Sequence, residues 1–365
     1  MTPTTEKTRL HRILVIQTAF LGDAVLITPL LRALKRSFPR STIDIVAIPQ
    51  TRELFRYHPA VQGILTFNKK NAFLKPFSFL KLLFSIRKNR YDAAISVQGS
   101  MTSSLLMKIG SVPKRIGFAN QKLVTDKMFL DRNAHAAIRH LNLLKSLTDK
   151  TFDPQTELFW SEKEKRNSER ILAGVRKETP FVLGIAPGSI WTTKRWPEEY
   201  FVELLKILSQ FRIKVFLFGG REDRSLCERI IDRSGTNAEN MAGALTLLES
   251  CSLIHEIDLM LSNDSAPLHL ANAVHTDVFA LFGPTVRGFG FYPFRQNDKV
   301  IETDLPCRPC AKHGGRRCPE KHFRCMRDIL PSAVAGLILD YFRGKGGLRP
   351  AHVPNAPGTR SGKPS

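Results

Sequence analysis

The chain has 365 residues, and its 55 Lys and Arg against 33 Asp and Glu give a formal net charge of +22. At about 150 residues per domain, this length predicts two domains that can each bury a core. A hydrophobic content of 42% with 24% charged residues is ordinary for a globular protein and excludes a mostly disordered chain. The positive charge predicts attraction to polyanions, namely nucleic acid, anionic lipid or a phosphorylated substrate.

The first half of the chain alternates short apolar runs with helical patterns. We expect strands at 13–16, 43–48, 64–67 and 93–97 and a helix over 24–38. This alternation is typical of a parallel sheet flanked by helices.

The second half repeats the scheme. We expect strands at 181–186, 215–218, 257–261 and 278–282, and helices over 161–177, 197–208 and 269–274. The sequence therefore predicts an α/β protein with two doubly wound, Rossmann-like domains, 1–165 and 166–343, that face each other across a central cleft. Ligands are then expected at the carboxyl ends of the strands.

Two other segments bear on the location of the protein. The apolar stretch 13–34 contains Gln17, Asp23 and Arg32, which argue against a signal peptide or a membrane span. Six Cys are too few for a disulfide-built secreted domain, so we expect a cytoplasmic protein. Residues 344–365 are rich in Gly and Pro and contain no acid, which predicts a disordered basic tail.

The turn after the first strand carries one candidate residue, Asp23. It follows Gly22 in the first turn of the expected helix, where the helix N-terminus stabilises a carboxylate. Such an acid is either a plain helix-start residue or a functional group, and spacing alone favours the plain helix-start residue. The turn has one glycine, so it lacks the three-glycine fingerprint of dinucleotide binders.

Two further strand-to-helix turns lie in the second half. The first passes from Gly188 and Ser189 through Thr193 to Lys194 and Arg195, and this density of donors suits either a diphosphate cradle or a solvated surface loop.

The other turn holds Asp264, Ser265 and His269, with the serine and histidine one helical turn apart. The turn lacks the Gly-x-Ser-x-Gly elbow of hydrolases, so binding of an anion and sugar hydroxyls fits it better than a catalytic triad. The alternative is that Asp264 serves only as a helix cap.

Together these motifs resemble glycosyltransferase family 9, the ADP-heptose:lipopolysaccharide heptosyltransferases, over about residues 12–335. The sequence stretches that carry the resemblance are Arg12-Ile-Leu-Val-Ile with Leu21-Gly-Asp23, Gln98-Gly99, Lys114-Arg-Ile-Gly-Phe118, Lys194-Arg-Trp-Pro197, Phe218-Gly-Gly-Arg-Glu-Asp223, Asn263-Asp-Ser-Ala-Pro-Leu-His269 and Phe282-Gly-Pro284. The resemblance implies a GT-B architecture with the donor nucleotide on the C-terminal domain. It also implies inverting transfer by direct displacement, with no metal or other cofactor needed for catalysis.

The resemblance assigns roles to these residues. It makes Asp23 the catalytic base and Lys194 the group that stabilises the leaving diphosphate. The donor-binding residues are Ser189, which with Lys194 would hold the diphosphate, Thr193 in the same turn, Glu222 or Asp223 at the ribose, and Asp264, Ser265 and His269 at the phosphate and heptose. One departure is Ala266, which stands where the family usually has glycine.

Four of the six cysteines crowd together as Cys307, Cys310, Cys318 and Cys325. This spacing is typical of a structural Zn or Fe site, although free thiols remain an alternative. Four thiolates would leave no open coordination position for catalysis.

The segment 69–90 combines basic and aromatic residues without an acid. It predicts either contact with an anionic membrane surface or an amphipathic helix with a solvated basic face.

These observations favour transfer of heptose from ADP-heptose to a lipid-linked, phosphorylated acceptor, the lipopolysaccharide inner core. The second-heptose enzyme fits best, placed in the cytoplasm and peripheral to the inner membrane. A relative that glycosylates a protein or another glycan is an alternative. A non-enzymatic polyanion binder is a distant one, and we expect no nucleic-acid partner because no recognised motif accompanies the charge.

Overall fold

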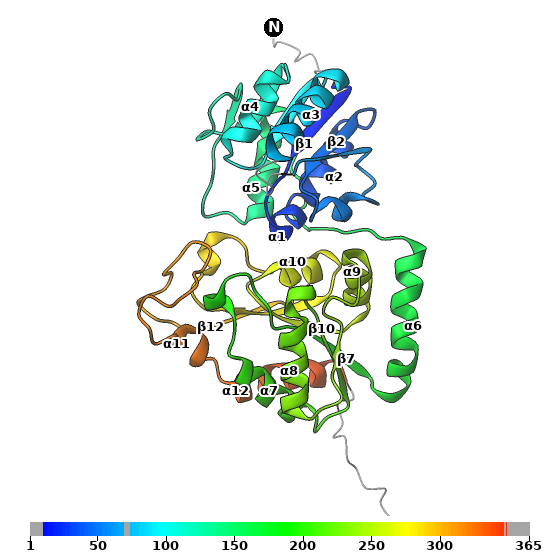
Figure 1. The fold of residues 1–365 in the computed structure, drawn as a ribbon, viewed down its shortest axis with the longest axis vertical. Coiled ribbons are helices and arrows are strands. Elements are labelled where there is room, and N and C mark those ends of the chain that lie inside the picture. Colours follow the sequence, from blue (N-terminus) through cyan, green and yellow to red (C-terminus); the bar gives the residue numbers. More distant parts are fainter. Residues whose placement is uncertain (1–9, 69–73, 347, 349–365) are drawn as a thin grey trace, which may run out of the picture.

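The computed structural model describes residues 10–68, 74–346 and 348. The expected disorder of the tail, at 347 and 349–365, and the basic residues at 69–73 lie outside the described residues. Two layered units stand one above the other and are joined by the segment 148–161, which has no regular structure (Figure 1).

The N-terminal domain is built on a parallel sheet with the strand order β3-β2-β1-β4-β5-β6. Its strands are β1 (Arg12–Ile16), β2 (Thr42–Ala47), β3 (Gly63–Thr66), β4 (Ala93–Ser96), β5 (Lys114–Phe118) and β6 (Asp126–Met128). Its helices are α1 (Leu21–Val25), α2 (Thr28–Ser37), α3 (Leu74–Asn89), α4 (Met101–Ile109) and α5 (Ala136–Asn142), with 3-10 turns η1 (Arg52–Phe55) and η2 (Leu143–Ser146).

The C-terminal domain repeats this design, with the strand order β12-β11-β10-β7-β8-β9. Its strands are β7 (Phe181–Ala186), β8 (Ile213–Leu217), β9 (Glu239–Asn240), β10 (Leu259–Asn263), β11 (Asp277–Phe282) and β12 (Lys299–Glu302). Its helices are α6 (Glu162–Glu178), α7 (Glu198–Leu208), α8 (Arg224–Ser234), α9 (Leu247–Glu256), α10 (Ala266–Ala273), α11 (Arg324–Arg327) and α12 (Pro331–Gly344), with 3-10 turns η3 (Thr192–Lys194), η4 (Arg221–Asp223) and η5 (Arg287–Phe289).

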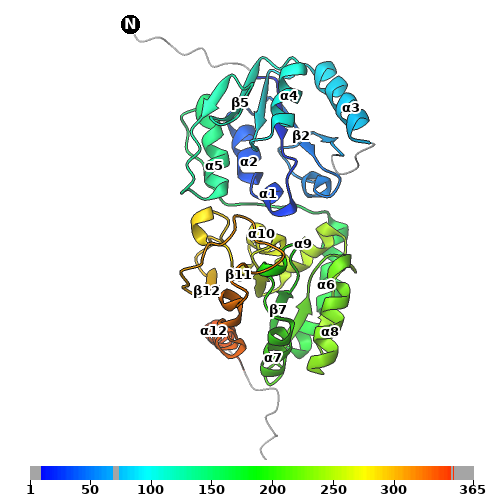
Figure 2. The ribbon, with the colours of Figure 1, turned by 60° about the vertical axis from the view of Figure 1, so that its left-hand side comes forward.

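In chain order, both sheets therefore have the 3-2-1-4-5-6 arrangement of the Rossmann fold, and the strand pairs are parallel. The expected pair of doubly wound domains is confirmed. The central strands β1 and β7 are buried almost throughout, because helices cover both faces of each sheet. Figure 2 shows these layers from the side.

The prediction of one helix over 24–38 is wrong, because α1 ends and α2 begins within this stretch. Pro29 has no N–H to donate to the carbonyl of Val25, and the hydroxyl of Thr28 donates to that carbonyl instead at 2.9 Å. The chain therefore ends α1 at Val25 and starts α2 at Thr28, which leaves α1 as a separate turn beside the other domain.

Two other boundaries are also corrected. The strand expected at 257–261 is β10 at Leu259–Asn263, and the following helix α10 begins at Ala266 rather than at His269. Asn263 stays in the ladder opposite Leu281, so the turn is shorter than the polar residues suggested. Strands β5, β6, β9 and β12 were not expected, since their short, partly exposed and charged sequences lack an apolar run.

The domains meet where α1 and α10 contact each other. Each of these helices follows the carboxyl end of a central strand, so the two carboxyl edges face one another. Among the described residues, no helix combines the length and the apolar character needed to cross a bilayer.

Candidate active site between the two domains

The N-terminal half of the site is the turn between β1 and α1. Buried Gln17 shapes this turn: its Nε2 donates to the backbone carbonyl of Asp23 at 2.9 Å, and its Oε1 accepts from the Ala19 N–H at 2.9 Å. Gln98, at the end of β4, accepts from both the N–H and the hydroxyl of Thr18. The turns after β1 and β4 are thus tied together where the strand order of the sheet reverses.

Gly22 lies at one of the contacts between the domains. A Cβ at Gly22 would lie 2.6 Å from Cδ2 of His269, so the backbone of α1 rests directly on that imidazole. Asp23 is the next residue and is half-buried. The structure therefore brings together Asp23 of one domain and the His269 helix of the other.

The C-terminal half centres on the buried carboxylate of Asp264. Its Oδ2 accepts hydrogen bonds from Lys194 Nζ and from the Thr285 hydroxyl, each at 2.6 Å. The side chains of Lys194 and Asp264 are 12% and 8% exposed, so this ion pair is largely withdrawn from water. Asp264 consequently holds Lys194 in a fixed position.

His269 lies in the same interface and is neutral near pH 7. Burial lowers its pKa to about 4, and the nearby carboxylate of Asp264 only partly opposes this shift. A neutral imidazole can accept or donate a hydrogen bond without adding charge to the site.

The turn after β7 packs beside this cluster. The Ser265 hydroxyl donates to the carbonyl of Gly188 at 3.4 Å, and Asn263 donates to the carbonyl of Pro187 at 2.8 Å. The Ser189 hydroxyl accepts from the Trp191 N–H at 3.4 Å. The turns after β7 and β10 therefore form one continuous surface.

Of the two acids proposed for the ribose, Asp223 lies against the turn after β7. A Cβ at Gly188 would lie 2.2 Å from Asp223 Oδ1, and the other oxygen of this carboxylate accepts from the Gly220 N–H at 3.1 Å. Burial raises the pKa of Asp223. Glu222 is exposed instead.

Residues 79–322 match the sequence profile of glycosyltransferase family 9 (heptosyltransferase), which is more than half of the chain. The chain belongs to glycosyltransferase family 9. It is a heptosyltransferase with the GT-B arrangement of two Rossmann-like domains.

Relatives of known name agree with this assignment. The chain is 28% identical to lipooligosaccharide heptosyltransferase 2 of Campylobacter jejuni, with 88% of this chain and 96% of the relative covered. It is 28% identical to lipopolysaccharide heptosyltransferase 2 of Escherichia coli K12, with 76% and 84% covered. The solved structure of E. coli ADP-heptose LPS heptosyltransferase II superposes with a TM-score of 0.75 at 25% identity, covering 92% of this chain and 100% of that one.

Thr193 of this heptosyltransferase has partners within the protein. Its hydroxyl donates to the carbonyl of Gly315 at 3.0 Å and accepts from the Gly315 N–H at 2.7 Å, and its own N–H donates to the same carbonyl at 3.1 Å. Residues 307–325, here named the cysteine strap, therefore brace the loop that carries Lys194. Burial and the positive charges of Lys312 and Lys194 lower the pKa of His313, which places this part of the strap beside Lys194.

The four cysteines of the strap are free thiols. Cys307 Sγ lies 3.9 Å from His322 Nε2, and burial together with the neighbouring thiols raises the pKa of Cys325 to about 11. Within residues 10–68, 74–346 and 348, no group of three or more His, Cys, Asp or Glu is arranged to hold a metal ion. A metal at the strap remains a prediction from the cysteine spacing.

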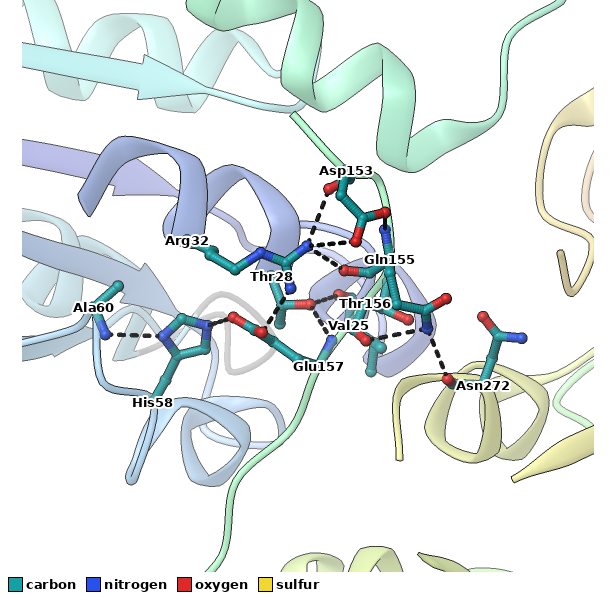
Figure 3. Close-up of polar contacts among 10 residues, drawn as sticks. All are labelled: Val25, Thr28, Arg32, His58, Ala60, Asp153, Gln155, Thr156, Glu157 and Asn272. Carbon is teal, nitrogen blue, oxygen red and sulfur yellow. Dashed lines mark hydrogen bonds and ion pairs between the residues drawn. The ribbon is translucent and has the colours of Figure 1, made fainter. Parts of the chain in front are cut away.

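The connection between the domains is fixed on the N-terminal side. Figure 3 shows the Arg32 guanidinium binding Glu157 at 2.6 Å and donating to the carbonyl oxygens of Asp153 and Gln155 at 3.0 and 2.9 Å. The Gln155 amide in turn donates to the carbonyl of Asn272, near the end of α10, at 3.1 Å. The linker thus joins α2 directly to the helix that carries His269.

Sequence reasoning missed three residues that shape the site: Gln17, Thr285 and Gly315. The Gln17 side chain bonds the backbone of the turn, and Gly315 bonds Thr193 through its own backbone groups. Contacts with the backbone leave little trace in a sequence. Thr285 directly follows the Phe282-Gly-Pro284 motif at the end of β11, so its place at a carboxyl edge was the available signal.

Proposed function

We propose that this heptosyltransferase moves heptose from ADP-heptose to the inner core of lipopolysaccharide, with inversion at the anomeric carbon. The names of the matching relatives support the donor and the acceptor class. The observation that supports the proposal most is the contact of Gly22 in α1 with His269 in α10. Asp23 follows Gly22, and the charges of Asp264 and Lys194 act on the same imidazole from the other domain.

Asp23 acts as the base in this proposal. Its carboxylate takes the proton of the acceptor hydroxyl as the hydroxyl oxygen attacks the anomeric carbon. The bond between that carbon and the diphosphate oxygen breaks on the opposite face, and ADP leaves. Inversion follows because the new bond and the broken bond lie on opposite sides of the carbon.

Lys194 stabilises the leaving group. Charge builds on the diphosphate as the bond breaks, and a cation held in place beforehand stabilises that charge without reorganising. Asp264 and Thr285 supply this positioning. Ser189, Ser265 and the N-terminus of α10 belong to the same surface and suit phosphate and sugar oxygens.

The decisive experiment is a transfer assay with mass-spectrometric readout. ADP-heptose, UDP-sugars and GDP-sugars are offered with acceptors truncated at successive inner-core positions. We expect transfer from ADP-heptose alone, and only to an acceptor that already carries the first heptose. Preference for another nucleotide sugar, or for an acceptor that lacks that heptose, would refute the respective part of the proposal.

A further inference from the structure

Helix α3 exposes three large apolar side chains. Phe77, Leu80 and Phe84 are 74%, 61% and 70% exposed. Because they are spaced three and four residues apart, they lie on the same side of the helix. The opposite side packs into the domain core through Leu82 and Ile86, which are buried. The helix is therefore anchored, and its outward side is still apolar.

Cations accompany this apolar side. Lys81, Arg87 and Lys88 are exposed and follow the same helical spacing as Phe77 and Phe84. The helix sequence contains no Asp or Glu. A surface that is both apolar and uniformly basic is complementary to a layer of apolar chains under anionic headgroups.

The neighbouring helix extends the surface. Helix α4 packs against α3, and its Met101 and Leu105 are 54% and 36% exposed, with Lys108 exposed one turn further on. We name the set of Phe77, Leu80, Lys81, Phe84, Arg87, Lys88, Met101, Leu105 and Lys108 the α3–α4 face. An open depression at the far end of α3 is lined in part by Arg87 and Arg90.

The first turns of α3 and α4 are the parts of the α3–α4 face that lie nearest the domain interface. Helices α3 and α4 follow β3 and β4, whose carboxyl ends lie at the edge of the sheet that faces the other domain. Phe77 and Met101, in the first turns of these helices, are accordingly nearest to that edge. Figure 2 shows α3 on the outer flank of the N-terminal domain, away from the C-terminal domain.

A second copy of the chain fits this face poorly. A two-fold contact would set the face against itself and bring Lys81, Arg87 and Lys88 against the same cations. The helix has no acid to offset this repulsion. An anionic bilayer has no such conflict.

We propose that the α3–α4 face docks on an anionic lipid bilayer and holds the domain interface beside the membrane surface. This inference extends the proposed function, since a lipid-linked acceptor is presented at such a surface. Membrane docking is tested without any transfer reaction. A failure of the docking proposal can therefore be distinguished from a failure of the proposed heptose transfer.

The test is co-sedimentation of the full chain with vesicles of phosphatidylcholine, with or without phosphatidylglycerol. We expect binding to the vesicles that contain phosphatidylglycerol, weakened by salt, and little binding to phosphatidylcholine alone. The variant Phe77→Ser/Leu80→Ser/Phe84→Ser removes the apolar part and Lys81→Glu/Lys88→Glu reverses the charge. Each variant should weaken binding at least about tenfold.

Leu330→Ser is the matched control, because Leu330 is 52% exposed on the C-terminal domain and should leave vesicle binding unchanged. All substituted side chains are exposed, so thermal unfolding midpoints should stay at the wild-type value. Undiminished binding by either α3 variant, or equal binding to neutral vesicles, would overturn the proposal. So would a dimer in sedimentation velocity that the triple variant dissociates, since the occupant would then be a second copy.

Discussion

Asp23 offers the sharpest test at the scale of single residues. It belongs to α1 on the N-terminal domain, whereas Lys194, Asp264 and His269 belong to the other domain. If it removes the acceptor proton, Asp23→Asn should lower kcat by about 10² to 10⁴-fold. ADP affinity, measured by calorimetry, should stay near the wild-type value. Parallel loss of transfer and of ADP binding would mean that Asp23 supports the donor site instead.

Lys194 combines a structural and a chemical role that two variants can separate. Lys194→Ala removes the cation that pairs with the buried carboxylate of Asp264, so we expect the free energy of unfolding to fall by about 3 kcal/mol. Lys194→Ala/Asp264→Asn removes the unpaired charge and should recover most of that stability.

The double variant should still transfer poorly, because the Lys194 cation no longer stabilises the leaving diphosphate. Urea unfolding measures the first effect and kcat/KM the second. A double variant that regains both stability and turnover would show that the ion pair is only structural.

At the scale of elements, the cysteine strap decides where the Lys194 loop lies. Gly314 has a φ of +86°, and a Cβ there would lie 3.0 Å from Trp191 Cβ and 3.1 Å from Lys194 Cγ. Gly314→Ala should therefore displace Lys194 and weaken ADP binding several-fold. Gly346→Ala is the matched control, since Gly346 also has a φ of +86° but has nothing within 4 Å. Equal ADP affinity in the two variants would argue against the strap as a brace.

The thiols of the strap give a second prediction at this scale. If a structural Zn or Fe ion joins Cys307, Cys310, Cys318 and Cys325, protein purified without chelators should contain about one metal ion per chain by elemental analysis. Cys318→Ser should lose that metal, whereas Cys227→Ser should keep it, because Cys227 is a buried residue of α8 and does not belong to the strap. Absence of stoichiometric metal from the wild type would rule the site out.

At the scale of the whole molecule, buried histidines make stability depend on pH. Burial lowers the pKa of His58, His140 and His269 to about 4, below the ordinary 6.5. The unfolded chain therefore binds more protons than the folded chain between these values, and stability falls as the pH drops through this window. Between pH 7 and pH 5 the expected loss is up to about 2 kcal/mol for each histidine.

Urea unfolding at several pH values measures this dependence. His58→Asn should make the slope between pH 5 and 7 shallower, because a buried group that titrates is gone. A stability that is flat from pH 7 to pH 5 would contradict the neutral state of these imidazoles.

The sequence by itself determined the architecture and the approximate position of the site. Alternating apolar runs and helical patterns are local signals, and a helix between successive strands returns the chain so that the strands pair in parallel. Because parallel strands end at one edge, Asp23, Ser189 and Asp264 were expected at the carboxyl ends before any contact was known. The expectation worked least well for the short strands β5, β6, β9 and β12, where charged residues replace an apolar run, and for the break at Pro29, where the N–H donor is missing.

The tertiary structure alone decided the partners within the site. Lys194 and Thr285 meet at Asp264 across 70 and 21 residues, and Thr193 meets Gly315 across 122. Gly22 meets His269 only because the two carboxyl edges face each other. Such pairs depend on strand order and on how the two domains are placed, and neither leaves a periodic signal in the chain.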